Sequence, residues 1–374
     1  MSGSHSSFYS QHNISPVSQD ISDLDKHFQR RESLFFALGL VPIYIRDKSV
    51  LEFGPGSGHN ALYTASLSPE QYELVDGNIK GVEETRNRLK GFTSIKLNVH
   101  HALFDEFNTS NRFDLVWAEG CLPHQSRPLP LLEHVASFVR NRGVLCISTS
   151  NGVSYLSETL RRLFRDRFFD SDGDVHMQAY RLMPYIKPHL QHLRGMSRPA
   201  EDWILDSIVQ PLQDRLLLSI PEVITCLDTN FDVYGSSPRF LTDWRWYKEI
   251  IGKSRGFNEI ALDNYYRNNL NLLDCRFEFP MHSVAFGAKL EQLGSQSWDL
   301  MCKIELGEKL AWKDLYNLMQ EMCAHIEKLA PVTAEAIREA MTLLQNGHPD
   351  MELKQFPQWW GRGQQYISLI RKHD

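Results

Sequence analysis

A glycine-rich turn between a strand pattern and a helix pattern most constrains the fold of this chain. Residues 49–51 predict the end of a buried strand, and residues 59–67 predict the helix that follows it. Gly54, Gly56 and Gly58 take every second position of the turn between them. Because glycine has no Cβ, the backbone can bend sharply there and a ligand can come close to it. The stretch therefore predicts a strand, a tight turn and a helix, with a ligand at the turn.

The spacing of the glycines separates two kinds of nucleotide-binding turn. A dinucleotide-binding fold has the pattern G-x-G-x-x-G, and its acidic residue stands on the next strand. This chain has G-x-G-x-G instead, and Glu52 stands two residues before the first glycine. The spacing disfavours an NAD-dependent dehydrogenase. Taken alone, it is also compatible with a plain strand-to-helix turn that binds nothing.

A second acidic residue ends the next strand pattern, residues 72–76. Strands that alternate with helices form parallel sheets, and the carboxyl ends of such strands meet at one edge. Asp76 is therefore expected near the glycine turn. A carboxylate there can accept hydrogen bonds from both hydroxyl groups of a ribose. The two features together predict a nucleoside site.

The order E-x-G-x-G-x-G followed by Asp76 resembles motifs I and II of the class I S-adenosylmethionine-dependent methyltransferases. The letters F-D-L-V at residues 113–116 are similar to the start of motif IV, and the resemblance spans about residues 46–150. It implies S-adenosylmethionine as cofactor and S-adenosylhomocysteine as product. The glycines would meet the amino-acid end of the cofactor, Glu52 its ammonium group and Asp76 its ribose. The cofactor-binding residues implied are Glu52, Gly54, Gly56, Gly58, Asp76, Gly77, Asn78, Ala102, Leu103, Glu119 and Gly120.

Repeated strand and helix patterns define the expected fold class. Four such repeats in about one hundred residues predict an α/β fold with a parallel sheet. The resemblance implies a Rossmann-like, doubly wound seven-stranded sheet with helical insertions and a helical C-terminal extension. Residues 221–227 and 231–235 match the family's later helix and sixth strand. The seventh strand is expected within residues 275–290.

The chain of 374 residues exceeds one typical domain, so additions to the core are expected. Insertions after the later strands would lie above the carboxyl ends of the sheet and build a substrate pocket. The parts expected are a flexible N-terminal segment or lid at 1–26, a cofactor-binding core at 27–150, a helical insertion serving as substrate lid at 151–218, the end of the core sheet at 219–290 with an inserted segment at 238–275, and a helical C-terminal region at 291–374.

Four side chains are candidates for the acceptor site. Tyr9 can close over the bound cofactor, or it can pack on the surface as a tail residue. Arg161 lies on a basic helix that can bind a phosphate or carboxylate, although a solvated face with local acidic partners is favoured. Trp244 and Trp246 can stack on a ring-bearing substrate. Core packing, with the charges of that segment turned outward, is slightly favoured for both.

Methyl transfer requires alignment of acceptor and methyl group more than activation, because the sulfonium cofactor is already activated. A hydroxyl acceptor also profits from a general base, and neutral histidine suits that role near pH 7. His124 follows the fourth strand pattern and is the first choice, with a structural loop histidine as the alternative. An amine acceptor needs no base beyond desolvation. The sequence contains no recognisable set of metal ligands.

The composition limits the kinds of partner that the chain is expected to bind. The net charge of −6 gives no overall attraction to nucleic acid or to an anionic membrane. The six cysteines form no C-x-x-C pair and no secretory signal is evident, so a cytoplasmic protein with free thiols is expected. The expected function is methylation of a small molecule at oxygen or nitrogen. A protein or RNA methyltransferase and a non-catalytic S-adenosylmethionine-binding module stay open as alternatives, as does a homodimer.

Overall fold

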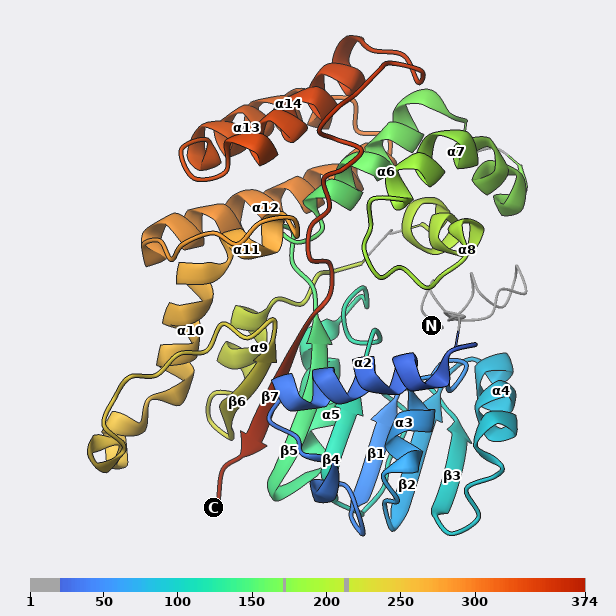
Figure 1. Ribbon diagram of the computed structural model, residues 1–374, viewed down its shortest axis with the longest axis vertical. Coiled ribbons are helices and arrows are strands. Elements are labelled where there is room, and N and C mark those ends of the chain that lie inside the picture. The colour runs from blue at the N-terminus through green and yellow to red at the C-terminus, as the bar shows by residue number, and fades with distance from the viewer. Residues whose placement is uncertain (1–20, 171–172, 212–214, 374) are drawn as a thin grey trace. The chain divides into compact units, whose positions relative to one another are not determined.

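The computed structural model describes residues 21–170, 173–211 and 215–373, and the chain divides into two compact units (Figure 1). Unit 1 comprises Met1–Thr149, Asp214–Tyr265 and Gln364–Asp374. Unit 2 comprises Ser150–Gln213 and Tyr266–Gly363.

Unit 1 contains one seven-stranded sheet in the order β3-β2-β1-β4-β5-β7-β6. All neighbouring strands pair in parallel except β7, which is antiparallel to both β5 and β6. The carboxyl ends of β1, β2 and β4 therefore share one edge, and the predicted doubly wound fold is confirmed. The strands are β1 (Ser49–Phe53), β2 (Gln71–Asp76), β3 (Lys96–His101), β4 (Phe113–Ala118), β5 (Val139–Thr149), β6 (Phe231–Ser237) and β7 (Gln365–Arg371).

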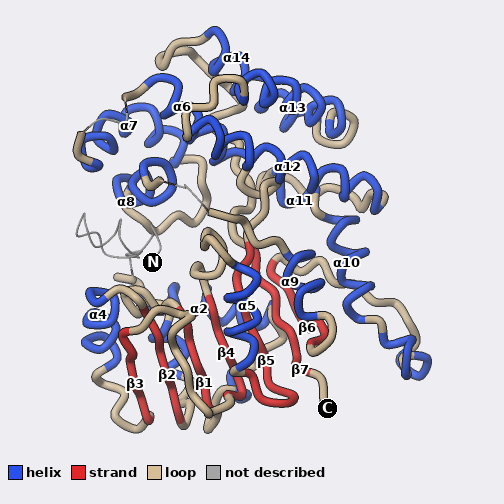
Figure 2. The backbone as a smooth tube through the Cα atoms, turned by 180° about the vertical axis from the view of Figure 1, so that it is seen from behind, coloured by secondary structure: helices blue, strands red, loops and turns tan. Residues whose placement is uncertain are grey.

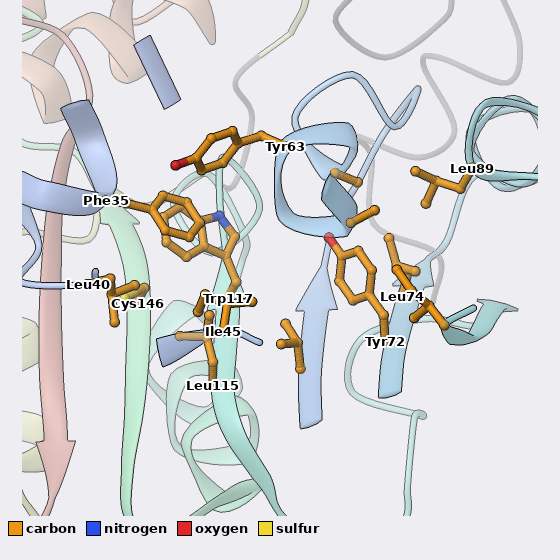
Figure 3. Close-up of a cluster of buried hydrophobic side chains, with 14 of the residues drawn as sticks. Phe35, Leu40, Ile45, Tyr63, Tyr72, Leu74, Leu89, Leu115, Trp117 and Cys146 are labelled. Carbon is orange, nitrogen blue, oxygen red and sulfur yellow. The ribbon is translucent and has the colours of Figure 1, made fainter. Parts of the chain in front are cut away.

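Helices cover both faces of this sheet (Figures 1 and 2). On one face, a buried cluster joins three helices to the central strands, and the ring of Phe35 stacks on that of Trp117 at 4.9 Å (Figure 3). The helices of that face are α2 (Leu24–Ala37), α3 (Ala61–Ser66) and α4 (Ile79–Leu89), with the short η1 (Pro42–Tyr44). The other face carries α5 (Pro128–Ser137) and α9 (Ile220–Leu227). The loop after β6 contains η3 (Tyr247–Glu249) and η4 (Gly252–Arg255).

The described part of unit 2 is helical. Helix α13 buries one apolar face, which includes Leu315, Met322 and Ile326, and Trp359 and Trp360 are fully buried within the unit. The elements are α6 (Leu156–Phe168), α7 (Val175–Leu190), α8 (Ala200–Ile204), η2 (Leu205–Val209), α11 (Leu270–Leu273), α12 (Val284–Glu305), α13 (Ala311–Ile326) and α14 (Pro331–Asn346), while α10 (Phe257–Asn268) crosses from unit 1.

The predicted position of the seventh strand is wrong. Residues 284–305 form α12, whose first turn is capped by the side chain of Ser283. The seventh strand is β7, which lies between β5 and β6 and buries Ile367 and Leu369. The prediction assumed a short hairpin after β6, but residues 238–364 separate the two paired strands. The C-terminal region is therefore helical only up to α14 and ends in a strand of the sheet.

Candidate cofactor site

The glycine turn after β1 adopts a backbone that requires glycine. Gly54, Gly56 and Gly58 have φ angles of 72°, 56° and 78°. Other residues rarely adopt this left-handed region. A Cβ on Gly54 would also lie 2.8 Å from the Cβ of Cys121. The prediction of a sharp turn without side chains is confirmed.

Helix α4 supports the turn from behind. The hydroxyl of Thr85 donates to the carbonyl of Gly56 at 2.9 Å, and Nε of Arg88 donates to the carbonyl of Ser57 at 2.8 Å. A Cβ on Gly81 would lie 2.8 Å from the Gly56 carbonyl oxygen, so the helix needs glycine there to come this close. These residues were not predicted. The sequence does contain a signal for two of them. Gly81 and Thr85 are small residues four positions apart on the helix that follows Asp76, so they share one helix face.

Asp76 joins the end of β2 to the turn. Its carboxylate accepts hydrogen bonds from the backbone N–H of Gly56 at 2.9 Å and of Asn78 at 2.8 Å. Burial raises the pKa of Asp76. Each carboxylate oxygen can accept a second hydrogen bond, so the group keeps capacity for two hydroxyl hydrogens. The structure brings Asp76 and the glycine turn together as the sequence predicts.

Two groups that were expected to contact the adenosine form hydrogen bonds within the protein. The side chain of Asn78 caps α4 by accepting from the N–H of Lys80 and of Gly81. The N–H of Ala102 donates to the carbonyl of Asp76 at 3.1 Å and continues the pairing of β2 with β3. The N–H of Ala102 is thus used within the sheet, and the contact of Ala102 with the cofactor stays a prediction. Leu103 lies beside Gly77 and can still present an apolar side chain.

Glu52 is buried against β2 instead of being exposed at the turn. The hydroxyl of Tyr72 donates to its carboxylate. Burial raises the pKa of Glu52 to about 7, although the Tyr72 hydrogen bond and the charge of Arg31 oppose the shift. The contact of Glu52 with the ammonium group of the cofactor stays a prediction.

Glu119 is a hydrogen-bonding centre just after β4. Its carboxylate accepts from Arg31 at 2.9 Å, from Asn60 at 3.2 Å, from the indole of Trp117 at 3.0 Å and from the hydroxyl of Tyr366 at 2.7 Å. These donors fill the roughly four acceptor positions of a carboxylate. The structure places Glu119 at the predicted edge, where its side chain organises its neighbours.

The following residue, Gly120, continues this edge. Its φ angle is 68°, and its N–H donates to the hydroxyl of Ser148 on β5 at 2.7 Å. The backbone after β4 is thereby fixed to the neighbouring strand. Gly120 is among the residues that the family resemblance implies for the cofactor.

Arg31 on α2 is a residue that the sequence did not single out. Its guanidinium is buried, lies 5.3 Å from the ring centre of Trp117, and has an Nε that finds no hydrogen-bond partner among the described residues. Burial opposes its charge, but the Glu119 carboxylate raises the pKa of Arg31. His27, Arg31 and Phe35 are four positions apart and share the buried face of α2. The available signal was an arginine that stands four positions before Phe35, at the spacing of one helix face.

His124 lies in the loop after β4, half-buried, with a φ angle of 66°. Its N–H donates to the carbonyl of Leu216 at 2.7 Å, and the N–H of Leu216 donates to the carbonyl of Gln125 at 3.2 Å. These two hydrogen bonds fix the backbone of the loop. The side chain stays a candidate base.

Arg161 does not lie at a surface that an acceptor can reach. Its side chain is 0% exposed and its guanidinium lies 3.6 Å from the ring centre of Trp360. Its N–H groups donate to the carbonyls of Ser157, Phe356 and Trp359 at 2.9 to 3.0 Å. The favoured interpretation as a solvated helix face is wrong, because apolar residues and carbonyls surround the charge inside unit 2.

The remaining acceptor candidates divide into two cases. Tyr9 lies outside the described residues. Trp244 and Trp246 are exposed on the loop after β6, so the favoured interpretation as core packing is wrong.

The described residues contain neither a metal-ligand cluster nor a helix that could span a membrane. Over residues 21–170, 173–211 and 215–373, no group of three or more His, Cys, Asp or Glu side chains can hold a metal ion. Within the same ranges, no helix combines the length and the apolar character that crossing a bilayer requires.

Comparison with known proteins gives one family. A family model for a methyltransferase domain matches residues 27–206, and no curated protein matches the chain. Among solved structures, the CcbJ methyltransferase of Streptomyces caelestis is 18% identical over 33% of this chain and 50% of its own, with a TM-score of 0.28. The N-methyltransferase NodS of Bradyrhizobium japonicum WM9, in complex with S-adenosyl-L-homocysteine, is 13% identical over 61% of this chain and 88% of its own, with a TM-score of 0.36.

A proposed sarcosine dimethylglycine methyltransferase of Galdieria sulphuraria is 10% identical over 99% of this chain and 98% of its own, with a TM-score of 0.41. This chain spans 50% of the length of the CcbJ structure. TM-scores this low carry no argument about the activity or the acceptor.

Features of the chain itself agree with the family model. The sheet order with an antiparallel β7, the glycine turn and the carboxylate of Asp76 all follow the expected plan. Residues 27–206 therefore form a methyltransferase domain, and the sheet order and glycine turn support a class I S-adenosylmethionine-dependent methyltransferase, whose cofactor is S-adenosylmethionine.

Proposed function

We propose that this chain transfers the methyl group of S-adenosylmethionine to a small-molecule acceptor, at oxygen or nitrogen. The observation that carries the proposal is the hydrogen bond between the N–H of Gly56 and the carboxylate of Asp76. This bond joins a side-chain-free turn to a carboxylate that would accept from a ribose, at the edge of the sheet where such folds bind nucleosides.

The order of the strands suggests how the cofactor lies. Along the edge, β2 is followed by β1 and then by β4. Asp76 after β2 would accept from the ribose, and the glycine turn after β1 would pass beneath the sulfur. The amino-acid end then reaches the region of Glu119, after β4.

Arg31 fits the carboxylate of that amino-acid end. It is held by Glu119, and its Nε finds no partner among the described residues. A carboxylate would satisfy this N–H with a charge-assisted hydrogen bond. Because Glu119 already accepts from four side chains, it would act by orienting Arg31.

The chain's own residues would then align the acceptor and exclude water, since the bound cofactor supplies an activated methyl group. We assign the general base for a hydroxyl acceptor to His124. A non-glycine residue with a φ angle of 66° is uncommon, and such backbones are frequent at functional sites. An amine acceptor would require only that its neutral form be desolvated.

A small molecule is preferred to RNA because the chain carries a net charge of −6, whereas affinity for RNA depends on neutralising phosphates. The test is incubation of the purified protein with methyl-labelled S-adenosylmethionine and a cell extract, which is then separated into metabolites, RNA and protein. Label in the metabolites supports the proposal. Label in RNA or protein would show that the acceptor is a macromolecule and not a small molecule. Cofactor binding without any transfer indicates a non-catalytic module.

A further inference from the structure

The loop after β6, residues 239–256, displays apolar side chains to solvent. Trp244 is 94% exposed, Trp246 58%, Tyr247 68% and Ile251 71%. Single exposed apolar residues are ordinary, but a group of them marks a surface that contacts something else. We call this segment the aromatic loop.

Three polar side chains of the aromatic loop, those of Asp243, Arg245 and Ser254, form hydrogen bonds within the loop and hold its shape. Arg245 pairs with both carboxylate oxygens of Asp243, at 2.9 and 2.6 Å. It also donates to the carbonyls of Ser254 and Arg255, on the far side of the loop. The hydroxyl of Ser254 donates to the carbonyl of Ile251 at 2.7 Å. The exposed position of the aromatic rings therefore belongs to a closed, hydrogen-bonded structure.

Residues 245–255 of the aromatic loop lie away from the cofactor edge. Arg255 pairs at 3.2 Å with Asp232, near the start of β6. Because β5 and β6 are both antiparallel to β7, the start of β6 lies at the amino edge of the sheet, opposite Asp76. Figure 1 shows this part of the chain at the lower left, at the start of α10. Trp244 and Trp246 therefore do not line the cofactor site, and another role is needed for them.

Positive charge surrounds these rings. The aromatic loop contains five basic and two acidic residues, whereas the whole chain has a net charge of −6. Asp243 is paired with Arg245, while Lys248 and Lys253 are exposed. Nζ of Lys248 lies 5.8 Å from the ring centre of Trp246 and 6.0 Å from that of Tyr247. Cations and aromatic rings thus share one surface.

This combination selects one occupant. In a twofold dimer the patch would meet itself and oppose lysine to lysine, which is unfavourable. Trp and Tyr prefer the interfacial layer of a bilayer, and Lys and Arg are attracted to anionic headgroups. We propose that the aromatic loop docks this protein on an anionic lipid surface, with Trp244, Trp246 and Ile251 entering the headgroup layer. The whole-chain charge, which disfavours membranes, does not describe this local surface.

The test uses the full chain and sedimentation with vesicles of phosphatidylcholine, with and without phosphatidylserine. We expect binding only when phosphatidylserine is present. The double variant Trp244→Ser, Trp246→Ser and the double variant Lys248→Glu, Lys253→Glu should each weaken it roughly tenfold or more. Leu310→Ser, at an exposed apolar residue of unit 2, is the matched control and should bind as the unchanged protein does.

Several results would overturn the proposal. Equal binding to both kinds of vesicle, or full binding by either double variant, removes the aromatic loop as a lipid-docking surface. Loss of a dimer in the tryptophan double variant identifies a second copy as the occupant. An oligonucleotide whose binding depends on Lys248 and Lys253, without vesicle binding, identifies nucleic acid. Lys248 should react with an acetylating reagent when no lipid is present. If it does not react, another part of the chain covers the aromatic loop.

Discussion

Arg31 of α2 and Glu119 after β4 form a buried ion pair, with 2.9 Å between Nη1 of the arginine and Oε2 of the glutamate. Asn60 and Tyr366 donate to the same carboxylate. The pair therefore ties α2, the glycine turn and β7 to the end of β4. This edge is where the family binds its cofactor.

Replacement of Arg31 by Met should weaken binding of S-adenosylhomocysteine roughly tenfold, because a charge-assisted hydrogen bond to the ligand carboxylate is lost. Binding of methylthioadenosine, which lacks the amino-acid end, should change little. Calorimetry gives both affinities. Arg30→Met, at an exposed position of the same helix, is the control. If Arg31→Met leaves the ratio of the two affinities unchanged, Arg31 does not bind the carboxylate.

Glu119→Ala should destabilise the protein by about 3 kcal/mol, because it leaves the buried guanidinium of Arg31 without its partner. Glu119→Gln should cost less, since the amide oxygen can still accept from Tyr366 and Asn60. Urea unfolding of the two variants measures the difference. Equal stability of the alanine variant and the unchanged protein would contradict a supporting role for Glu119.

The protonation of Glu52 should make stability depend on pH. The pKa of Glu52 is about 7 in the folded chain, whereas its ordinary value is 4.5. Between these two pH values the folded state therefore retains a proton that the unfolded state releases. Stability should therefore fall as pH rises from about 4.5 to about 7, by roughly 3 kcal/mol. Glu52→Gln should abolish this part of the dependence. An identical pH profile for the two proteins would show that Glu52 does not titrate in this range.

Substitution of His124 by Ala should lower turnover of a hydroxyl acceptor roughly a hundredfold while cofactor affinity stays the same. Steady-state kinetics and calorimetry separate the two effects. His348→Ala, at an exposed position of unit 2, controls for loss of an imidazole alone. Full activity of His124→Ala would remove this residue as the base.

Local patterns predicted the parts of the site that depend on neighbouring residues. The left-handed turn at Gly54, Gly56 and Gly58 and the strand ending at Asp76 follow from short-range geometry and from the parallel sheet. The position of β7 did not follow, because its pairing with β5 and β6 joins residues far apart in the chain.

Features set by tertiary contacts were also missed. In the sequence, Arg31 is one of several charged residues of α2. Only the tertiary structure shows that it contacts Glu119 and Trp117. A segment rich in tryptophan and arginine ordinarily packs its rings inward. Here Arg245 binds Asp243 and backbone carbonyls, which leaves Trp244 outside.

Titration of S-adenosylhomocysteine into the unchanged protein, Asp76→Ala and Asp105→Ala tests the central claim most directly. Asp105 is an exposed residue after β3 and serves as the control. We predict saturable binding to the unchanged protein and to Asp105→Ala. Asp76→Ala should bind more weakly by about 1 to 3 kcal/mol, because the ribose hydroxyls lose their acceptor. Equal affinity of all three proteins, or binding of NAD without any binding of S-adenosylhomocysteine, would contradict the account.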